Sequence, residues 1–154
     1  MTPEEKTGFI TLVMKILLVQ TSFVGDVILS IPVISGIKKI FPEAVFWMMT
    51  TPLSAVLVIR DPLLAGVLID DKKGKNSGLT GLLKMKRQIK DMAFDRIYSL
   101  HRSHRTSLLL WLSRIPLRIG FADTKLSFLY HETRKIMTLS ETCRCFPVKL
   151  LQCR

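Results

Sequence analysis

Short apolar runs alternate with longer amphipathic stretches along the chain. The first run, residues 15–20, reads KILLVQ. A continuous apolar run of this length is typical of a parallel strand that is buried on both faces. The same kind of pattern predicts further strands at residues 44–49, 66–69, 96–100 and 117–121.

The stretches between these runs favour helices. A turn at residues 21–25 leads into a predicted helix over residues 26–40 that contains Pro32. Proline costs about 3 kcal/mol inside a regular helix, so we expect the helix to bend there or its regular part to begin near Ser30. Five isoleucines recur every three residues and predict one buried stripe, namely Ile28, Ile31, Ile34, Ile37 and Ile40. The other predicted helices cover residues 52–59, 80–92 and 103–113, and residues 70–78 have the composition of a solvated loop.

Regular alternation of strands and helices with short connections predicts an α/β fold, in which helices flank a Rossmann-like parallel sheet. A chain of 154 residues with 48% apolar and 23% charged residues is large and apolar enough for one folded domain. We expect that domain at residues 14–137, after an amino-terminal extension at residues 1–13. We expect residues 138–154 to be an atypical tail, which a truncated or frame-shifted gene would explain. Its three cysteines have the spacing of neither a disulfide framework nor a metal site, and they are Cys143, Cys145 and Cys153.

The net charge of +11 predicts attraction to anionic partners. The apolar stretch at residues 8–19 is interrupted by Lys15 and is shorter than the roughly 20 residues of a spanning helix. Glu4 and Glu5 occupy the positions where a secretory signal carries positive charge, so we expect a cytoplasmic protein.

Two interpretations of the basic residues stay open. A non-enzymatic nucleic-acid-binding module is the less favoured one, because aromatic residues are only 8% and are not interleaved with basic ones, so no specific nucleic acid is expected. The predicted helix at residues 80–92 is favoured as a solvated face, with peripheral contact to an anionic inner membrane as the alternative. Its basic residues are Lys84, Lys86, Arg87 and Lys90.

Candidate chemistry lies in the turns after the first and fourth strands, because ligands of parallel sheets bind beyond the carboxyl ends of the strands. The first turn reads TSFVGD over residues 21–26 and ends in Asp26. By position alone, Asp26 is more often a carboxylate that complements a helix dipole. The turn lacks the spaced glycines of a dinucleotide fingerprint. The second turn, SLHRSHRTS at residues 99–107, is dense in hydrogen-bond donors.

Residues 15–32, KILLVQTSFVGDVILSIP, resemble the opening of glycosyltransferase family nine, the heptosyltransferases of lipopolysaccharide core assembly. FPEA at residues 41–44, the polar loop within residues 100–110, and IPLRIGF at residues 115–121 follow in the order and spacing of that family. The resemblance implies the acceptor-side domain, which is the amino-terminal half of a GT-B glycosyltransferase. The family's second domain, which binds the ADP part of the donor, has no counterpart in these residues.

The resemblance also implies roles for single residues. Asp26 takes the place of the family's general base in an inverting, metal-independent transfer of heptose from ADP-heptose, which is a donor substrate and not a cofactor. The anionic inner core of lipopolysaccharide, with its Kdo carboxylates and phosphates, would be the acceptor. A sugar transferase acting on another cell-envelope acceptor is the related alternative. The expected acceptor-binding residues are Arg105 and Arg118, then Arg102, Ser22 and Gly25, with His101 and His104 as weaker candidates. No metal-binding residue is expected.

Overall fold

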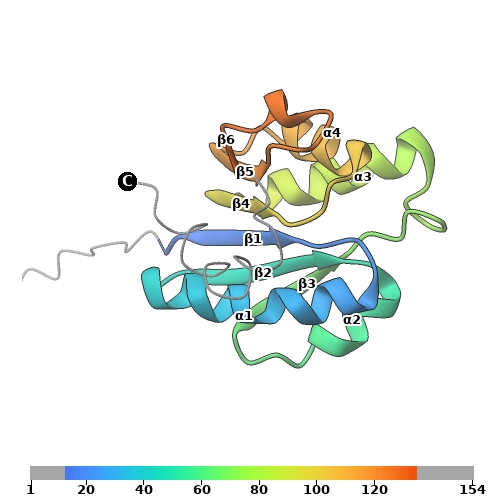
Figure 1. Ribbon diagram of the computed structural model, residues 1–154. Coiled ribbons are helices and arrows are strands. Elements are labelled where there is room, and N and C mark those ends of the chain that lie inside the picture. Colours follow the sequence, from blue (N-terminus) through green and yellow to red (C-terminus); the bar gives the residue numbers. More distant parts are fainter. Residues whose placement is uncertain (1–12, 135–154) are drawn as a thin grey trace, which may run out of the picture.

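The computed structural model describes residues 13–134, and strands alternate with helices throughout them as predicted (Figure 1). A short 3-10 helix at Ser127–Leu129 precedes the last strand. In chain order the elements are β1 (Lys15–Val19), α1 (Val24–Ile40), β2 (Val45–Thr50), α2 (Pro52–Val58), β3 (Leu64–Ile69), α3 (Gly78–Asp91), β4 (Arg96–Ser99), α4 (His104–Leu112), β5 (Leu117–Phe121) and β6 (Glu132–Arg134).

All six strands are parallel and form one sheet in the order β3-β2-β1-β4-β5-β6. The chain builds outward from β1 to β3, then returns to the other side of β1 and builds outward again from β4. This is the strand order of a doubly wound, Rossmann-like sheet, and it confirms the predicted fold class.

The sheet is covered on both faces, α1 and α2 on one and α3 and α4 on the other (Figure 1). Side chains of β1 alternate between these layers because successive residues of a strand point to opposite faces. Ile16 and Leu18 pack in the cluster with α1, whereas Leu17 and Val19 pack in the cluster with α3 and α4. All four side chains are fully buried, as expected for the central apolar run.

Helix α1 differs from its prediction in two respects. It begins at Val24 and continues through Pro32, which is exposed. Proline removes the hydrogen bond to the carbonyl of Ile28, and Ile28 lies on the exposed side of the helix. The predicted isoleucine stripe is wrong, because positions three apart drift by about 60° per step around a helix of 3.6 residues per turn. Ile28 and Ile40 are exposed, and the buried face consists of Val27, Ser30, Val33, Ile34 and Ile37.

Strand β6 was not predicted. It pairs in parallel with β5, and the chain before it packs closely because Gly120 of β5 has no side chain. A Cβ atom at Gly120 would lie 2.7 Å from the ring of Tyr130. The hydroxyl of Tyr130 in turn lies within hydrogen-bond distance of Ser99 and Ser107. The expected extension and tail, including the three cysteines, lie almost wholly outside the described residues.

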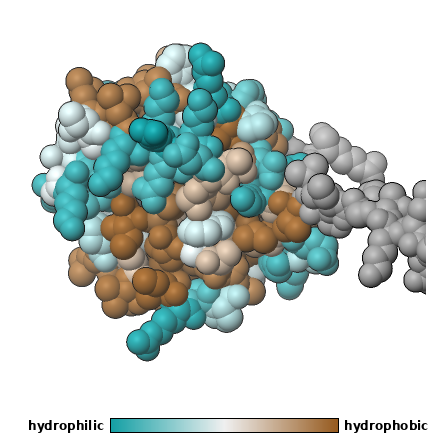
Figure 2. All heavy atoms as spheres, turned by 180° about the vertical axis from the view of Figure 1, so that it is seen from behind, coloured by the Kyte–Doolittle hydropathy of each residue, from teal (hydrophilic) through white to brown (hydrophobic). Residues whose placement is uncertain are grey.

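Helices α1 and α2 expose apolar side chains. Figure 2, which views the molecule from behind, shows apolar surface over its lower half, the side on which these helices lie in Figure 1. The most exposed of these side chains are Leu29, Leu53 and Val56, and Phe23, just before α1, is also exposed. Among residues 13–134, no helix combines the length and the apolar character needed to cross a membrane.

Candidate active site at the carboxyl edge of β1 and β4

The turns predicted to carry chemistry meet at one edge of the sheet. Val19 of β1 pairs with Ser99 of β4, and the Leu100 amide donates to the Val19 carbonyl at 2.9 Å. Beyond this pair the chain turns to opposite faces, into α1 after β1 and into α4 after β4 (Figure 1). The strand order therefore reverses between β1 and β4, which is where ligands of doubly wound sheets bind.

Asp26 lies in the first turn of α1 and is exposed. Its Oδ2 lies 2.7 Å from the Ser22 hydroxyl, which is also 2.9 Å from Oε1 of Gln20. Because a hydroxyl has one proton, Ser22 donates to one of the two oxygens at a time. A Cβ atom at Gly25 would meet no atom within 4 Å. The carboxylate is therefore oriented by Ser22, and Asp26 and its neighbour Gly25 are both exposed to solvent.

Lys72, from the loop after β3, reaches back across the edge to β1. Its Nζ donates to the Thr21 hydroxyl at 2.6 Å and lies 3.5 Å from the hydroxyl of Thr106 in α4. Burial lowers the pKa of Lys72, the nearby carboxylate of Asp70 raises it, and the guanidinium of Arg105 lowers it. Lys72 thus connects three elements with an ammonium group that is partly removed from water.

His101, two residues after β4, is affected by the charges of the same edge. Burial, the largest cause, lowers its pKa to about 4, with Lys72 and Arg102 acting in the same direction and Asp26 in the opposite one. His101 is therefore neutral at pH 7 and does not supply a cation. Arg102 is exposed, and in the described part of the chain its side chain forms no hydrogen bond.

Arg105 contacts the chain itself. Its Nη1 lies 2.7 Å from Oδ2 of Asp70, whose side chain is 0% exposed, and its Nη2 donates to the backbone carbonyl of Asn76. Gly81 of α3 permits this arrangement, because a Cβ atom there would lie 2.1 Å from the carbonyl carbon of Asn76. Arg105 thus holds the β3–α3 loop, which also carries Lys72, against α4.

Arg118 is not part of this group. It is the second residue of β5 and lies towards the amino end of the strands, opposite to the edge with Asp26. It is only 9% exposed, and its guanidinium donates to the backbone carbonyls of Ile115 and Leu129. We therefore leave Arg118 out of the candidate site.

The structure brings together most of the predicted site residues, which are Ser22, Gly25, Asp26 and Arg102, with Arg105 behind them. Sequence reasoning missed Lys72, because its loop has the composition of a solvated segment. A signal was present, since Lys72 lies in the turn just after the carboxyl end of β3, which ends at Ile69. Within residues 13–134, no three histidine, cysteine, aspartate or glutamate side chains are grouped closely enough to hold a metal ion.

The strand order defines the class of the protein as a Rossmann-like α/β domain, in which the order reverses between β1 and β4. Within that class, the chain is similar to a family 9 glycosyltransferase from Veillonella parvula DSM 2008, with 22% identity and a TM-score of 0.75 over 80% of this chain and 36% of that one. It is also similar to ADP-heptose lipopolysaccharide heptosyltransferase II of E. coli, with 22% identity and a TM-score of 0.66 over 80% of this chain and 35% of that one.

A third similar structure is E. coli heptosyltransferase WaaC with ADP-2-deoxy-2-fluoro heptose, with 16% identity and a TM-score of 0.65 over 82% of this chain and 44% of that one. Neither a family model nor a curated protein matches the sequence. The chain spans 35 to 44% of the length of these three glycosyltransferases. At such identities the likeness shows a shared fold, and the fold is the one that the sequence resemblance implied.

Proposed function

We propose that this chain is the acceptor-binding part of an inverting, metal-independent glycosyltransferase that transfers heptose from ADP-heptose to the inner core of lipopolysaccharide. The observation that carries the proposal is Asp26, an open carboxylate oriented by Ser22 at the edge where β1 and β4 part. The shared fold with two E. coli heptosyltransferases supports it.

In the proposed reaction, Asp26 accepts the proton of an acceptor hydroxyl while the hydroxyl oxygen attacks the anomeric carbon of the donor. The new carbon–oxygen bond forms as the bond to ADP breaks, and ADP leaves with the electron pair. Attack from the face opposite to the leaving group inverts the anomeric carbon. One base close to the acceptor oxygen is sufficient for this step, and the open space beside Gly25 leaves room for the sugar.

We assign the anionic groups of the acceptor to Arg102 and Lys72. Arg102 is exposed without a partner in the described chain, and its guanidinium can bind a carboxylate or phosphate through two hydrogen bonds. Lys72 adds a second positive charge whose partial burial strengthens its interaction with an anion. Arg105 acts as a positioning residue, because it holds the loop that carries Lys72.

The proposal also includes a second domain and a location in the cell. A second domain would bind the ADP-sugar, because both substrates must be oriented in one cleft for the attack. The enzyme would work in the cytoplasm, and α3 would contact the anionic inner membrane through exposed basic residues such as Lys84, Arg87 and Lys90.

The test is Asp26→Asn in a chain that carries both domains, with ADP release as the assay for transfer. We expect transfer to fall by about 10²-fold or more, the usual contribution of a general base, while the dissociation constant for a Kdo-containing acceptor changes little. Glu43→Gln, the same loss of a carboxylate at the exposed turn before β2, is the matched control. Equal turnover of the Asp26 and Glu43 variants would remove Asp26 from the mechanism.

Acceptor binding is testable on the 154-residue chain alone. Arg102→Gln is expected to raise the dissociation constant of a Kdo-containing acceptor about tenfold, since it removes a charge-assisted contact. Unchanged binding in this variant would refute the assignment of the acceptor to this edge.

A further inference from the structure

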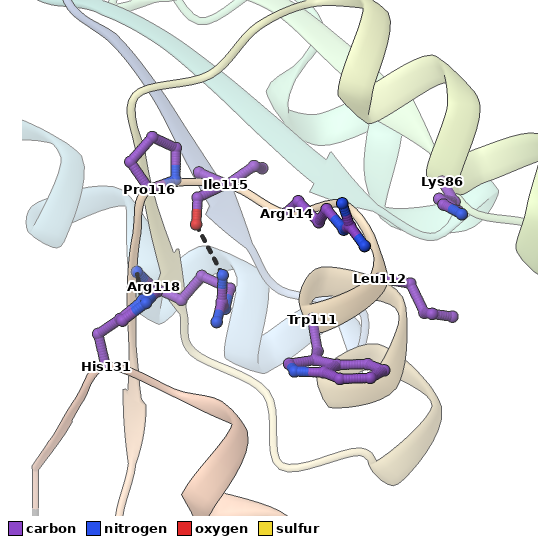
Figure 3. Close-up of a pocket in the computed structure, with 8 residues that line it drawn as sticks. All are labelled: Lys86, Trp111, Leu112, Arg114, Ile115, Pro116, Arg118 and His131. Carbon is purple, nitrogen blue, oxygen red and sulfur yellow. Dashed lines mark hydrogen bonds between the residues drawn. The ribbon is translucent and has the colours of Figure 1, made fainter.

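A cavity of about 420 Å³ lies at the other end of the strands from Asp26. It opens between α3, α4 and the start of β5. Figure 3 shows Arg118 and His131 on one side of it and Trp111 and Leu112 on the other. Its lining includes three cations, Lys86, Arg114 and Arg118, and no carboxylate.

Arg118 is the unusual member of this lining. It is nine-tenths buried, and neither of the two ion pairs found among residues 13–134 involves it. A buried charge without a counter-ion costs several kcal/mol unless other groups compensate for it. Two backbone carbonyls accept hydrogen bonds from the guanidinium, but they carry no full negative charge and do not neutralise it.

The other polar groups around the cavity are donors. Nδ1 of His131 accepts a hydrogen bond from the Arg118 amide at 3.3 Å, which leaves its proton on Nε2 as a donor. Arg114 also lines the cavity. Its backbone has a φ of 51°, a left-handed conformation that costs a non-glycine residue about 1 kcal/mol. Trp111 is 46% exposed and adds an apolar wall with an indole N–H.

We propose that this cavity is a second anion site, which binds a phosphate monoester or diphosphate between Arg118, Arg114 and Lys86. Cations that approach from several sides, without a competing carboxylate, suit the separated oxygens of a phosphate group. The site is distinct from the edge with Asp26 and is independent of the function proposed above. The phosphate is either that of a soluble compound or that of a lipid headgroup, and the experiment separates the two.

The probe is inorganic pyrophosphate, titrated into the full 154-residue chain at constant ionic strength. Binding is followed by tryptophan fluorescence and, independently of Trp111, by ³¹P line broadening. Saturable binding is expected, and Arg114→Gln and Lys86→Gln should each raise the dissociation constant about three- to tenfold. Arg118→Met is expected to destabilise the domain, because Arg118 donates to two backbone carbonyls, so Arg114 and Lys86 carry the test.

Two controls make the result specific. Lys84→Gln removes an exposed lysine of α3 outside the cavity, and Arg60→Gln removes an exposed arginine just after α2 that does not line the cavity. Both should bind pyrophosphate as the unaltered chain does. Absence of saturable binding would overturn the proposal, and so would equal binding by the Arg114 and Lys84 variants.

Vesicles of phosphatidylglycerol in phosphatidylcholine identify the source of the phosphate. Vesicle binding that pyrophosphate displaces and that Arg114→Gln weakens would indicate a lipid headgroup. Pyrophosphate binding without vesicle binding would indicate a soluble phosphate compound. Vesicle binding that is equal in the Arg114 and Arg60 variants, without pyrophosphate binding, would refute the site.

Discussion

Replacing Arg105 with methionine removes the guanidinium that neutralises Asp70 and leaves a similar volume of apolar atoms. The side chain of Asp70 is 0% exposed, so water cannot take over the role of Arg105 without rearrangement of the loop. Breaking a buried ion pair from one side costs about 3 to 5 kcal/mol. Because Arg105 is itself 24% exposed and Lys72 lies near Asp70, we expect the lower end, about 3 kcal/mol.

Urea denaturation followed by circular dichroism measures the free energy of unfolding. For a chain of this size, about 3 kcal/mol corresponds to a melting temperature lower by roughly 10 °C. Arg102→Met is the matched control and should change the free energy by less than about 0.5 kcal/mol, since Arg102 is an exposed residue. Adding Asp70→Asn to Arg105→Met should recover part of the loss, because the uncompensated charge is gone.

Equal stability of the Arg105 and Arg102 variants would refute this reasoning. It would mean that Asp70 does not depend on Arg105, and that the guanidinium of Arg105 is free to bind the acceptor, as the sequence first suggested.

The remaining predictions concern two glycines and one histidine. Gly81→Ala should destabilise the domain by about 1 to 3 kcal/mol, because its Cβ would meet the backbone of Asn76. Gly25→Ala, whose Cβ would meet nothing within 4 Å, should be neutral or stabilising by up to about 1 kcal/mol. Thermal denaturation compares the two variants, and equal melting temperatures would contradict this. His101 has a pKa of about 4 when folded and near 6.5 when unfolded, so the unfolded chain binds more protons between these values. The stability contributed by neutral His101 is therefore fully present above pH 6.5 and falls towards pH 4, with a slope below about 1.4 kcal/mol per pH unit because the residue is partly exposed. His101→Gln should flatten that slope in urea denaturation at pH 7, 5.5 and 4.5, and parallel pH profiles would disprove it.

The fold was predictable where local patterns reflect burial on both faces. The apolar run of β1 and the alternation of elements indicated a parallel sheet, and five of the six strands were placed. Strand β6 was missed because Glu132, Thr133 and Arg134 form no apolar run, and its position depends on the close packing of Tyr130 over Gly120. The isoleucine stripe failed because a spacing of three alone does not follow one face of a helix.

The candidate site was predictable in its location and less so in its residues. The rule that ligands bind beyond the carboxyl ends of strands found the turns after β1 and β4. It did not distinguish an arginine that faces solvent, Arg102, from one that neutralises a buried carboxylate, Arg105. That distinction depends on Asp70 and Asn76, which are about 30 residues away in sequence and are brought close only by the packing of α3 on α4.

The length of the parallel strands separates the cavity near Trp111 from the edge with Asp26. A strand of five residues is about 16 Å long, and charges at exposed positions are screened over about 8 Å at physiological ionic strength. A change of charge near Trp111 is therefore felt only weakly at Asp26. Substitutions that change the charge of the cavity can therefore accumulate with little effect on the electrostatic environment of Asp26.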